Sequence, residues 1–420
     1  MIARVSPSTL TGTLFAPPSK SIFQRVVAMA LLCEGTTRII NPCFSDDCLS
    51  ALAMAGALGA GIEESDDDLL IHGGFKPQFS EINAHESGLG MRLFSAIAAL
   101  HNQPLKLTGS GSLSARPMSL IQDGLKDFGV EVTLTEGKIP VTITGPLKPG
   151  KVTVDGSVSS QFLTGLLIAL PTLEEDSELE VTNLVSKPYI DLTLEIMEIF
   201  GVSVIHKNYE KFYIPGKQKY KACDIFIEID WSGAAFLLVA GALAENNTLA
   251  IGGLQTQLTQ ADQSIVGALL FSGSKLKNEE GLVTQTAHKI KPFQFDATDC
   301  PDLFPPLAAL AAFAEGPCEI TGTNRLIHKE SNRGVAIQSE FAKAGIKVIL
   351  EGDTMTIIPA AIQACTIDGH GDHRIVMAAT ILGLFGAPIE IHGAEAIAKS
   401  YPEFFDDLVG LGAKISCKNQ

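Results

Sequence analysis

The sequence predicts an α/β protein of two domains, and three observations lead to that fold class. The chain has 420 residues, more than one hydrophobic core normally spans, so two domains are expected. Apolar residues make up 46% of the chain and charged residues only 19%, a composition that can bury a large core. Short β-branched segments alternate with helical segments rich in Ala and Leu, which is the pattern of an α/β fold.

A repeat organises the helical segments. Six stretches open with Ser, Asp or Gly residues and continue as an apolar helix, and their starts are 68 to 73 residues apart. A fixed period indicates repeated supersecondary units, and helices that are apolar nearly all round are expected to be buried. The starts are Ser19, Ser87, Ser159, Ser232, Asp302 and Asp372.

Strands and second helices are expected between these starts. The strand-like segments are short, rich in β-branched residues and bounded by Gly, Pro or Asp. They are 37–43, 140–145, 151–157, 224–230 and 354–360. Second helices are expected at 119–129, 192–201 and 334–345, so each unit consists of strands plus two helices.

Several Lys and Arg residues lie near predicted helix starts, where the helix dipole disfavours positive charge. Lys20 falls in the first turn after Ser19, and Arg25 one turn later, although a helix N-terminus stabilises acids by roughly 0.3–1 kcal/mol. Convergence of such cations on one place would favour an anionic ligand, because helix N-termini and Arg side chains bind phosphate and carboxylate. The alternative, open for any one residue, is a solvated surface position. The other cations are Arg92, Arg116, Arg333, Arg374 and Lys399.

Further polar residues accompany the cations. Hydroxyls and an amide open the third helix, and a carboxylate beside cations can serve as a base. Each residue also has a plain structural interpretation, such as a helix cap, a packed Tyr or a solvated charge. The residues are Ser159, Ser160, Gln161, Ser186, Tyr189, Asp302, Lys329 and Glu330.

Composition excludes several function classes. The net charge is −16 with no Lys/Arg block, so nucleic acid is not an expected partner. The longest apolar stretches are too short to span a bilayer, and the first residues lack a signal-peptide pattern. His370 and His373 lack an evident third ligand, so no metal is expected. The eight cysteines form no C-x-x-C motif, which favours reduced thiols in the cytoplasm.

Nine motifs taken together resemble the 5-enolpyruvylshikimate-3-phosphate synthase family of enolpyruvyl transferases. They occur in the family's order and extend from about residue 17 to residue 405. The motifs are "PSKSIFQR", Gly88–Arg92, "ARP", "SSQFLTGLL", "SKPYIDLT", "PD" at 301–302, "HKESNR", "GDHRIVMA" and "AKSYPEFF".

The resemblance implies two domains, each of three βαβαββ-like repeats with buried parallel helices, and an active site in the interdomain cleft. A discontinuous domain of residues 1–17 plus 229–420 would bind mainly phosphoenolpyruvate. Residues 18–228 would form the second domain, mainly on the shikimate 3-phosphate side. A cytoplasmic monomer with these two small-molecule substrates and no cofactor is expected.

The implied reaction joins shikimate 3-phosphate and phosphoenolpyruvate to give an enolpyruvyl ether and phosphate. Carried over by position, the shikimate side is Lys20, Ser21, Arg25, Ser159, Ser160, Gln161, Ser186, Tyr189, Asp302 and Lys329. The phosphoenolpyruvate side is Lys20, Gly88, Arg116, Gln161, Arg333, Arg374 and Lys399, with Arg92 and His373 as further substrate-binding residues. Asp302 is expected to take the proton of the 5-hydroxyl, and Glu330 or Lys20 to protonate C3 of the enol.

The chain departs from the family pattern at three places. Phe23 and Gln24 replace a small polar residue and Asn, and Asn332 replaces Asp before Arg333. Residues 86–90, Glu-Ser-Gly-Leu-Gly, replace Asn-x-Gly-Thr-Ala. We expect the last change to alter the wall of the phosphoenolpyruvate pocket and the sensitivity to glyphosate, an inhibitor of the family.

Two other functions compete with this interpretation. An enolpyruvyl transferase acting on a UDP-sugar normally relies on a reactive loop Cys, and residues 93–158 contain no Cys. A non-catalytic binding protein could retain the fold. The presence of Lys20, Asp302, Glu330 and Arg374 argues against that second alternative.

Overall fold

The computed structural model describes residues 1–65, 67–157, 160–244, 249–286, 289–327 and 329–418. The chain divides into two compact units. Met1–Pro17 and Ile229–Gln420 form the first, called here the C-terminal unit. Pro18–Glu228 forms the second, called the N-terminal unit.

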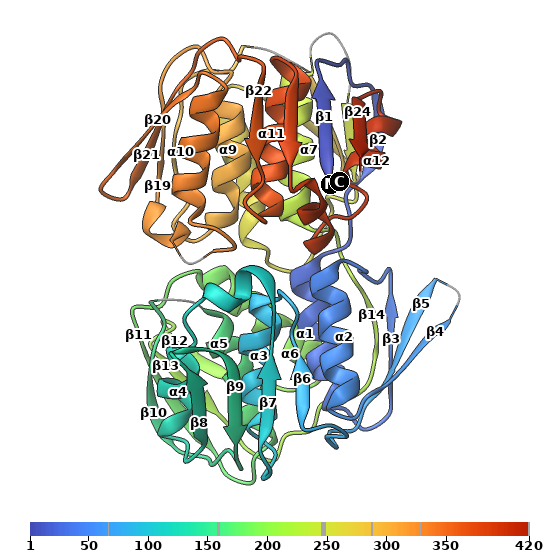
Figure 1. The fold of residues 1–420 in the computed structure, drawn as a ribbon. Coiled ribbons are helices and arrows are strands. Elements are labelled where there is room, and N and C mark those ends of the chain that lie inside the picture. The colour runs from blue at the N-terminus through green and yellow to red at the C-terminus, as the bar shows by residue number, and fades with distance from the viewer. Residues whose placement is uncertain (66, 158–159, 245–248, 287–288, 328, 419–420) are drawn as a thin grey trace. The chain divides into compact units, whose positions relative to one another are not determined.

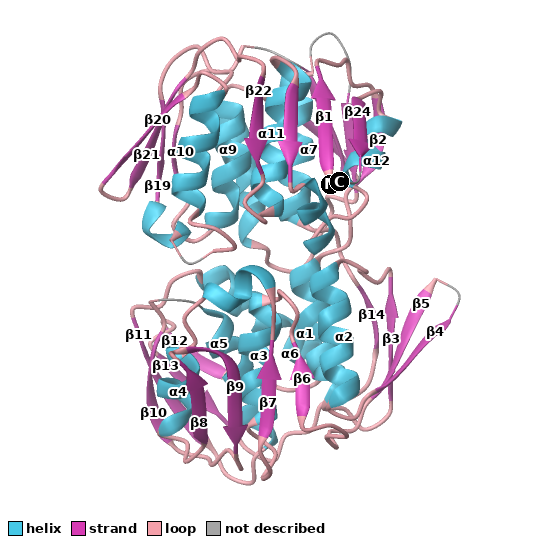
Figure 2. Cartoon of the chain, viewed as in Figure 1, coloured by secondary structure: helices cyan, strands magenta, loops and turns pink. Residues whose placement is uncertain are grey.

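In the N-terminal unit, helices lie inside and three four-stranded sheets lie around them (Figures 1 and 2). The first sheet has the order β14 (Asp224–Phe226), β3 (Thr36–Ile40), β5 (Asp68–His72), β4 (Gly61–Ser65). The second is β6 (Glu81–Asn83), β7 (Leu105–Thr108), β9 (Lys138–Thr144), β8 (Glu131–Thr135). The third is β10 (Lys151–Asp155), β11 (Ser177–Thr182), β13 (Lys211–Ile214), β12 (Ile205–Lys207). The helices are α1 (Lys20–Leu31), α2 (Asp46–Ala57), α3 (Gly88–Ala98), α4 (Ser119–Lys126), α5 (Ser160–Ala169) and α6 (Lys187–Ile199), with short 3-10 turns η1 (Gly111–Ala115) and η2 (Leu170–Thr172).

The C-terminal unit has the same layout of sheets and helices. Its sheets are β2 (Gly12–Phe15), β15 (Leu249–Gly252), β17 (Leu282–Thr286), β16 (Lys275–Glu279); β18 (Gln294–Asp296), β19 (Cys318–Thr321), β21 (Thr354–Ile358), β20 (Lys347–Glu351); and β22 (Cys365–Asp368), β23 (Ile389–His392), β1 (Ile2–Ser6), β24 (Lys414–Lys418). Its helices are α7 (Trp231–Leu243), α8 (Ile265–Phe271), α9 (Phe304–Ala311), α10 (Arg333–Lys343), α11 (His373–Phe385) and α12 (Phe404–Gly410). Its 3-10 turns are η3 (Ala261–Ser264), η4 (Pro301–Leu303), η5 (Thr323–Leu326) and η6 (Ala394–Lys399).

All six sheets share one topology. The first two strands in each order are parallel, with a helix between strands such as β10 and β11 that follow each other in the chain, and the remaining pairs are antiparallel. Parallel neighbours need a long crossover, whereas antiparallel ones need only a short turn. The predicted α/β class with six βαβαββ-like repeats is therefore confirmed.

Two sheets take a strand from a distant part of the chain. Strand β14 pairs in parallel with β3, and strand β2 pairs in parallel with β15. The chain passes between the units near these strands. There the Ser19 amide donates to the Glu228 carbonyl at 2.7 Å within one unit, and the Asp230 amide donates to the Pro17 carbonyl at 2.7 Å within the other.

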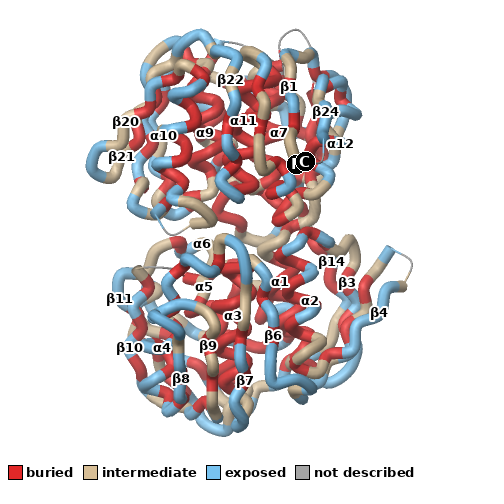
Figure 3. Tube along the Cα trace, in the orientation of Figure 1, coloured by how far each residue is buried: buried red, intermediate tan, exposed pale blue. Residues whose placement is uncertain are grey.

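The repeated helices are buried, as their composition predicts. Every residue of α3 is buried, and so are residues 373–384 of α11 (Figure 3). Ser19, Ser87 and Asp372 accept hydrogen bonds from the first turns of their helices, so these three predicted starts are correct. No helix among the described residues is both long and apolar enough to cross a membrane.

Other predicted boundaries shift by a few residues. Helix α7 begins at Trp231 rather than Ser232, because Asp230 accepts from the amides of Ser232 and Gly233 and so caps the helix. Helix α6 begins at Lys187, five residues before the predicted 192, with Pro188 in its first turn.

Candidate active site

Asp302 is the centre of a charged cluster in the C-terminal unit. It lies in η4, directly before the apolar helix α9. Its Oδ1 accepts from Lys329 Nζ at 3.1 Å and from Arg333 Nη1 at 2.7 Å, and its Oδ2 accepts from Arg374 Nη2 at 3.1 Å. Loops and helix starts that lie far apart in the sequence thus bring three predicted substrate-binding cations to one carboxylate.

The side chain of Arg333 is fully buried, and several carboxylates hold its guanidinium group in place. Its Nε donates to Asp372 Oδ2 at 2.9 Å and its Nη2 to Asp372 Oδ1 at 3.2 Å. Nη2 also donates to Glu330 Oε2 at 2.6 Å. Asn332 instead caps α10 by accepting from the Val335 amide at 3.4 Å, so Asp372 orients Arg333 despite the Asn at position 332.

The electrostatics of the cluster keep Asp302 ionised. Burial is the largest single influence and favours the neutral carboxyl, but Arg374, Lys329 and Arg333 outweigh it and hold the pKa of Asp302 well below its usual range. Burial favours the neutral form of Lys329 too, and therefore lowers the pKa of Lys329 against the opposing effect of Asp302. The site is thus built from mutually compensating charges.

The pairing corrects one step of the sequence argument. Cations gathered at helix starts repel one another, and their convergence was expected to favour an anionic ligand. In the structure, carboxylates already face them: Asp302 faces Arg374, and Asp47 Oδ2 accepts from Lys20 Nζ at 2.9 Å. Protein carboxylates therefore offset part of the repulsion, and an anion would compete with them for the same cations.

Lys399 and His373 lie close to the turn that leads into helix α11. Lys399, in η6, donates from Nζ to the Gly371 carbonyl at 2.7 Å. His373 opens α11, is 1% exposed, and has its Nδ1 4.0 Å from Asp372 Oδ1. Asp372 also caps α11 through the Arg374 amide at 3.0 Å. One carboxylate thus organises the helix start that bears two predicted site residues.

A second buried carboxylate, Asp262, lies near this cluster. It is 2% exposed and accepts a hydrogen bond from the hydroxyl of Ser232. Burial first, and then the charge of Asp302, raise the pKa of Asp262 to about 7, against the lowering effect of Arg374. Asp262 therefore holds its proton in the folded protein far above the pH at which an unfolded chain releases it.

We expect Asp262→Asn to stabilise the protein more at pH 8 than at pH 5. Between the unfolded pKa near 4 and the folded value of about 7, the folded protein binds more protons, so the free energy of unfolding falls as pH rises. Asn keeps an acceptor for Ser232 but cannot ionise. The gain should be larger at pH 8 by about 2.5 kcal/mol, measured by denaturant unfolding at both pH values. The exposed Asp406→Asn is the control, and equal gains at both pH values would contradict the assignment.

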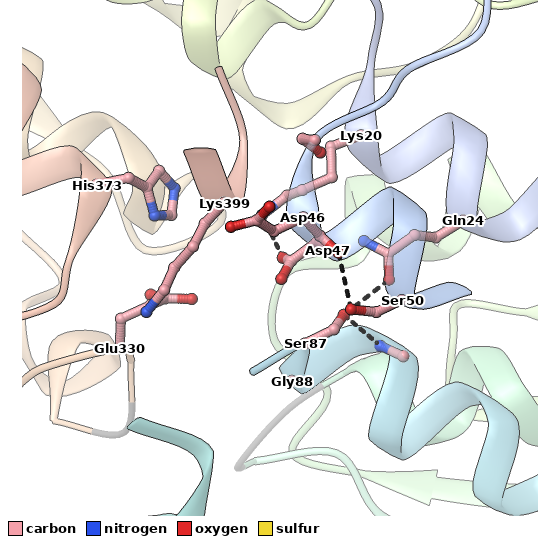
Figure 4. A network of polar contacts seen from close by, with 12 residues as sticks. Lys20, Gln24, Asp46, Asp47, Ser50, Ser87, Gly88, Glu330, His373 and Lys399 are labelled. Carbon is pink, nitrogen blue, oxygen red and sulfur yellow. Dashed lines mark hydrogen bonds and ion pairs between the residues drawn. The ribbon is translucent and has the colours of Figure 1, made fainter. Parts of the chain in front are cut away.

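In the N-terminal unit, Lys20 opens α1 and Asp47 lies in the first turn of α2 (Figure 4). Both side chains of this ion pair are largely buried. Gln24, one turn after Lys20, accepts at Oε1 from Ser87 Oγ at 3.0 Å. Ser87 in turn caps α3 through the Gly90 amide at 3.0 Å. Gln24, one of the residues at which the chain departs from the family pattern, thus links α1 to the start of α3 through a hydrogen bond.

Gly88 lies where two guanidinium groups approach the start of α3. A Cβ at Gly88 would lie 2.3 Å from Arg116 Nη1 and 3.1 Å from Arg92 Nη1, so only Gly leaves room for both as they stand. Arg92 Nη1 donates to Gln161 Oε1 at 2.8 Å and to the Gly88 carbonyl at 3.3 Å. Four predicted site residues therefore gather at this helix start.

The loop that leads to Arg116 is held by Glu86. Its Oε2 accepts from the Ser112 amide at 3.0 Å and from Ser112 Oγ at 3.1 Å. A Cβ at Gly111, whose φ is +53°, would lie 2.2 Å from this carboxylate. The acidic replacement at position 86 thus bonds to the turn η1, of which Arg116 is the C-terminal cap.

Arg25 is a buried cation with neutral partners. It donates to Thr193 Oγ1 at 2.9 Å, to the Ser21 carbonyl at 2.8 Å and to the Tyr189 carbonyl at 3.3 Å. Burial lowers the pKa of Arg25 to about 10. Tyr189 follows Ser186, the residue before α6, and its amide donates to the Ser186 carbonyl at 3.1 Å. A buried cation among neutral oxygens can be offset by an anionic ligand.

The remaining predicted residues open helices of the same unit. Ser21 lies in the first turn of α1, and Ser160 is the first residue of α5 and 5% exposed. Ser159 lies outside the described residues. In the part of the chain that the structure describes, no three His, Cys, Asp or Glu side chains gather as a metal site.

Sequence reasoning missed several carboxylates that hold predicted site residues within each unit. Asp372 was identified only as a helix start, and Asp47, Asp262 and Glu86 were given no such role. The helix-cap position of Asp372, directly before His373 and Arg374, is a signal that could have identified it. The other three partners are set by tertiary contacts that leave no pattern in the sequence.

Comparison with known proteins identifies the family of the chain. The family model described as EPSP synthase (3-phosphoshikimate 1-carboxyvinyltransferase) matches residues 5–408. A 3-phosphoshikimate 1-carboxyvinyltransferase of Clostridium kluyveri is 38% identical over 416 residues, covering 98% of this chain and 97% of the relative. One from Methanosarcina acetivorans is 36% identical over 426 residues, with 99% of each covered.

Two solved structures have a fold similar to that of this chain. An EPSP synthase from Acinetobacter baumannii superposes with a TM-score of 0.83 at 25% identity, covering 99% of this chain and 100% of that chain. The enolpyruvyl transferase NikO from Streptomyces tendae has a TM-score of 0.79 at 18% identity, with 99% and 98% covered, and shows the likeness of fold. The chain belongs to the EPSP synthase (3-phosphoshikimate 1-carboxyvinyltransferase) family.

Proposed function

We propose that this protein transfers the enolpyruvyl group of phosphoenolpyruvate to the 5-hydroxyl of shikimate 3-phosphate. The reaction proceeds by addition and elimination. The 5-oxygen bonds to C2 of phosphoenolpyruvate while C3 gains a proton. The tetrahedral intermediate then loses phosphate and a C3 proton to give the enolpyruvyl ether. The observation that carries this assignment is the carboxylate of Asp302 held by Lys329, Arg333 and Arg374.

Asp302 is the base that removes the 5-hydroxyl proton in this scheme. Its depressed pKa makes it a weak base while three cations hold it. Phosphoenolpyruvate is anionic and competes for Arg333 and Arg374. As those cations turn to the substrate, the pKa of Asp302 rises toward the range in which a carboxylate accepts a proton. Substrate binding would thereby activate the base.

Two groups compete for the proton transfer at C3. Glu330 is within the Asp302 cluster through its 2.6 Å contact with Arg333, and Lys20 is an ammonium in the N-terminal unit. The arginines and lysines stabilise the negative charge of the intermediate and of the departing phosphate. We propose that residues of both units act on the same two substrates, with Arg25, Ser160, Ser186 and Tyr189 on the shikimate 3-phosphate.

The decisive experiment measures phosphate release from the purified protein. Phosphate should appear only when phosphoenolpyruvate and shikimate 3-phosphate are both present. Release with a UDP-sugar in place of shikimate 3-phosphate would favour the other transferase. Binding of either ligand without turnover would favour a non-catalytic protein. We expect the active protein to be a cytoplasmic monomer, which size-exclusion chromatography and cell fractionation would test.

Leu89 provides a test of the phosphoenolpyruvate side. It follows Gly88 in α3, is 8% exposed, and stands where the family usually has Thr. We expect Leu89→Thr to shift the glyphosate inhibition curve, because a hydroxyl replaces an apolar surface at the start of the helix. Inhibition of phosphate release is the measurement. Superimposable curves for the two proteins would contradict this expectation.

A further inference from the structure

Glu340 is a buried carboxylate that the proposed reaction does not use. It lies on α10, about two turns after Arg333, and its side chain is only 3% exposed. Burying an ionised carboxylate is costly unless hydrogen bonds or opposite charges offset the loss of water. The contacts of Glu340 therefore indicate what this residue holds in place.

The carboxylate of Glu340 contacts two residues of one turn, Asp368 and His370. Oε2 accepts from the Asp368 amide at 2.8 Å, and Oε1 lies 2.9 Å from Nε2 of His370. Lys343 Nζ donates to Oε2 at 2.6 Å from the next turn of the same helix. These partners lower the pKa of Glu340 against the opposing effect of burial.

The turn that Glu340 contacts contains a residue with a left-handed backbone. His370 has φ = +53°, a conformation that is uncommon for residues other than Gly, although His adopts it more often than most residues. Such a conformation persists where surrounding contacts hold it. The hydrogen bond of His370 to Glu340, and that of its amide to Asp368 Oδ1 at 2.7 Å, supply those contacts.

Residues at the end of this turn contact three residues that are predicted to bind phosphoenolpyruvate. The Gly371 carbonyl accepts from Lys399 Nζ at 2.7 Å. Asp372 accepts from the guanidinium of Arg333 and caps the helix at the Arg374 amide. A displacement of the turn would therefore move the partners of all three cations together.

We propose that Glu340 is a positioning residue for the phosphoenolpyruvate side of the site, acting through the turn at residues 368–372. The inference rests on the proposed function and deepens it. Glu340 touches no substrate in this scheme. It holds the Gly371 carbonyl and the Asp372 carboxylate at the places where Lys399, Arg333 and Arg374 need them.

The test compares three variants in the phosphate-release assay. Glu340→Gln keeps the size of the side chain but loses the charge that His370 and Lys343 face. We expect the KM for phosphoenolpyruvate to rise about tenfold or more, since small displacements of binding groups cost up to about 10²-fold. The KM for shikimate 3-phosphate should change less than about twofold, because the residues named for it lie mostly on the N-terminal unit. His370→Ala should change the same KM in the same direction.

Lys343→Ala is the matched control. It removes a second partner of the same carboxylate, but one that is 46% exposed and lies on α10 rather than in the turn. Its kinetic constants should stay at the wild-type values. Thermal unfolding of each variant shows whether the proteins are folded at the assay temperature.

Two results would overturn the inference. One is a Glu340→Gln protein with a lower Tm and unchanged kinetic constants. The other is an equal rise in both KM values. Either result would make Glu340 a structural residue only. Turnover by the wild-type protein with both substrates tests the proposed function separately, so failure of the one is distinguishable from failure of the other.

Discussion

Asp302→Asn is expected to lower kcat by roughly 10²- to 10⁴-fold, the range that a positioned general base contributes. The amide has nearly the same shape, but only one of its two terminal atoms accepts hydrogen bonds, so either Arg374 or the pair Lys329 and Arg333 loses its acceptor. The amide also cannot take the 5-hydroxyl proton. It also leaves three nearby cations with one negative charge fewer. We therefore expect the folded protein to lose about 1–3 kcal/mol of its free energy of unfolding.

The measurement is steady-state phosphate release together with denaturant unfolding. Asp296→Asn is the control, because Asp296 lies at the end of β18 in the same unit and contacts none of these cations. A kcat within about threefold of wild type would rule out Asp302 as the base, since general-base catalysis is worth far more. A stability loss without a loss of kcat would assign it a structural role.

Lys20→Met is expected to abolish measurable turnover while the protein stays folded. Met keeps the length of the side chain but removes the ammonium group. Loss of one such electrostatic contact to a developing charge typically costs about 10²–10³-fold in kcat, and Lys20 is also one of the two candidates for proton transfer at C3. The loss should therefore exceed that of a residue that only binds.

The ion pair of Lys20 with Asp47 provides the comparison. Asp47→Asn removes the partner at 2.9 Å but leaves the ammonium, so it should retain substantial turnover. Phosphate release and circular dichroism of both variants are the measurements. Near-normal turnover of Lys20→Met would refute its role. Equal losses in both variants would indicate that the pair, rather than the ammonium, is what matters.

Much of the fold could be predicted from local pattern. Ser19, Ser87 and Asp372 were expected to open buried helices and do so, because a capping side chain followed by an apolar run is determined by neighbouring residues. The pairing of β14 with β3, in which Asp224 lies opposite Arg38, has no such local cause. Segment 224–230 was identified as a strand, but its place in the sheet depends on where the rest of the chain folds.

The residues of the candidate site could be proposed from the sequence, but the contacts that hold them could not. Lys20, Arg116, Arg333 and Arg374 were identified as cations in unusual places. Their carboxylate partners were missed, because ion pairs such as Arg333 with Asp372 form across 39 residues and depend on the three-dimensional arrangement of α10 and α11.

The amino-acid sequence by itself determined the α/β class, the six repeats and the residue types that can meet an anion, since helix caps, apolar periodicity and charge are properties of short segments. The tertiary structure alone decided which charges compensate one another, and hence the low pKa of Asp302 and the raised pKa of Asp262. The reason is physical: the pKa of a carboxyl depends on its burial and on charges within a few ångströms, and those neighbours come from distant parts of the chain.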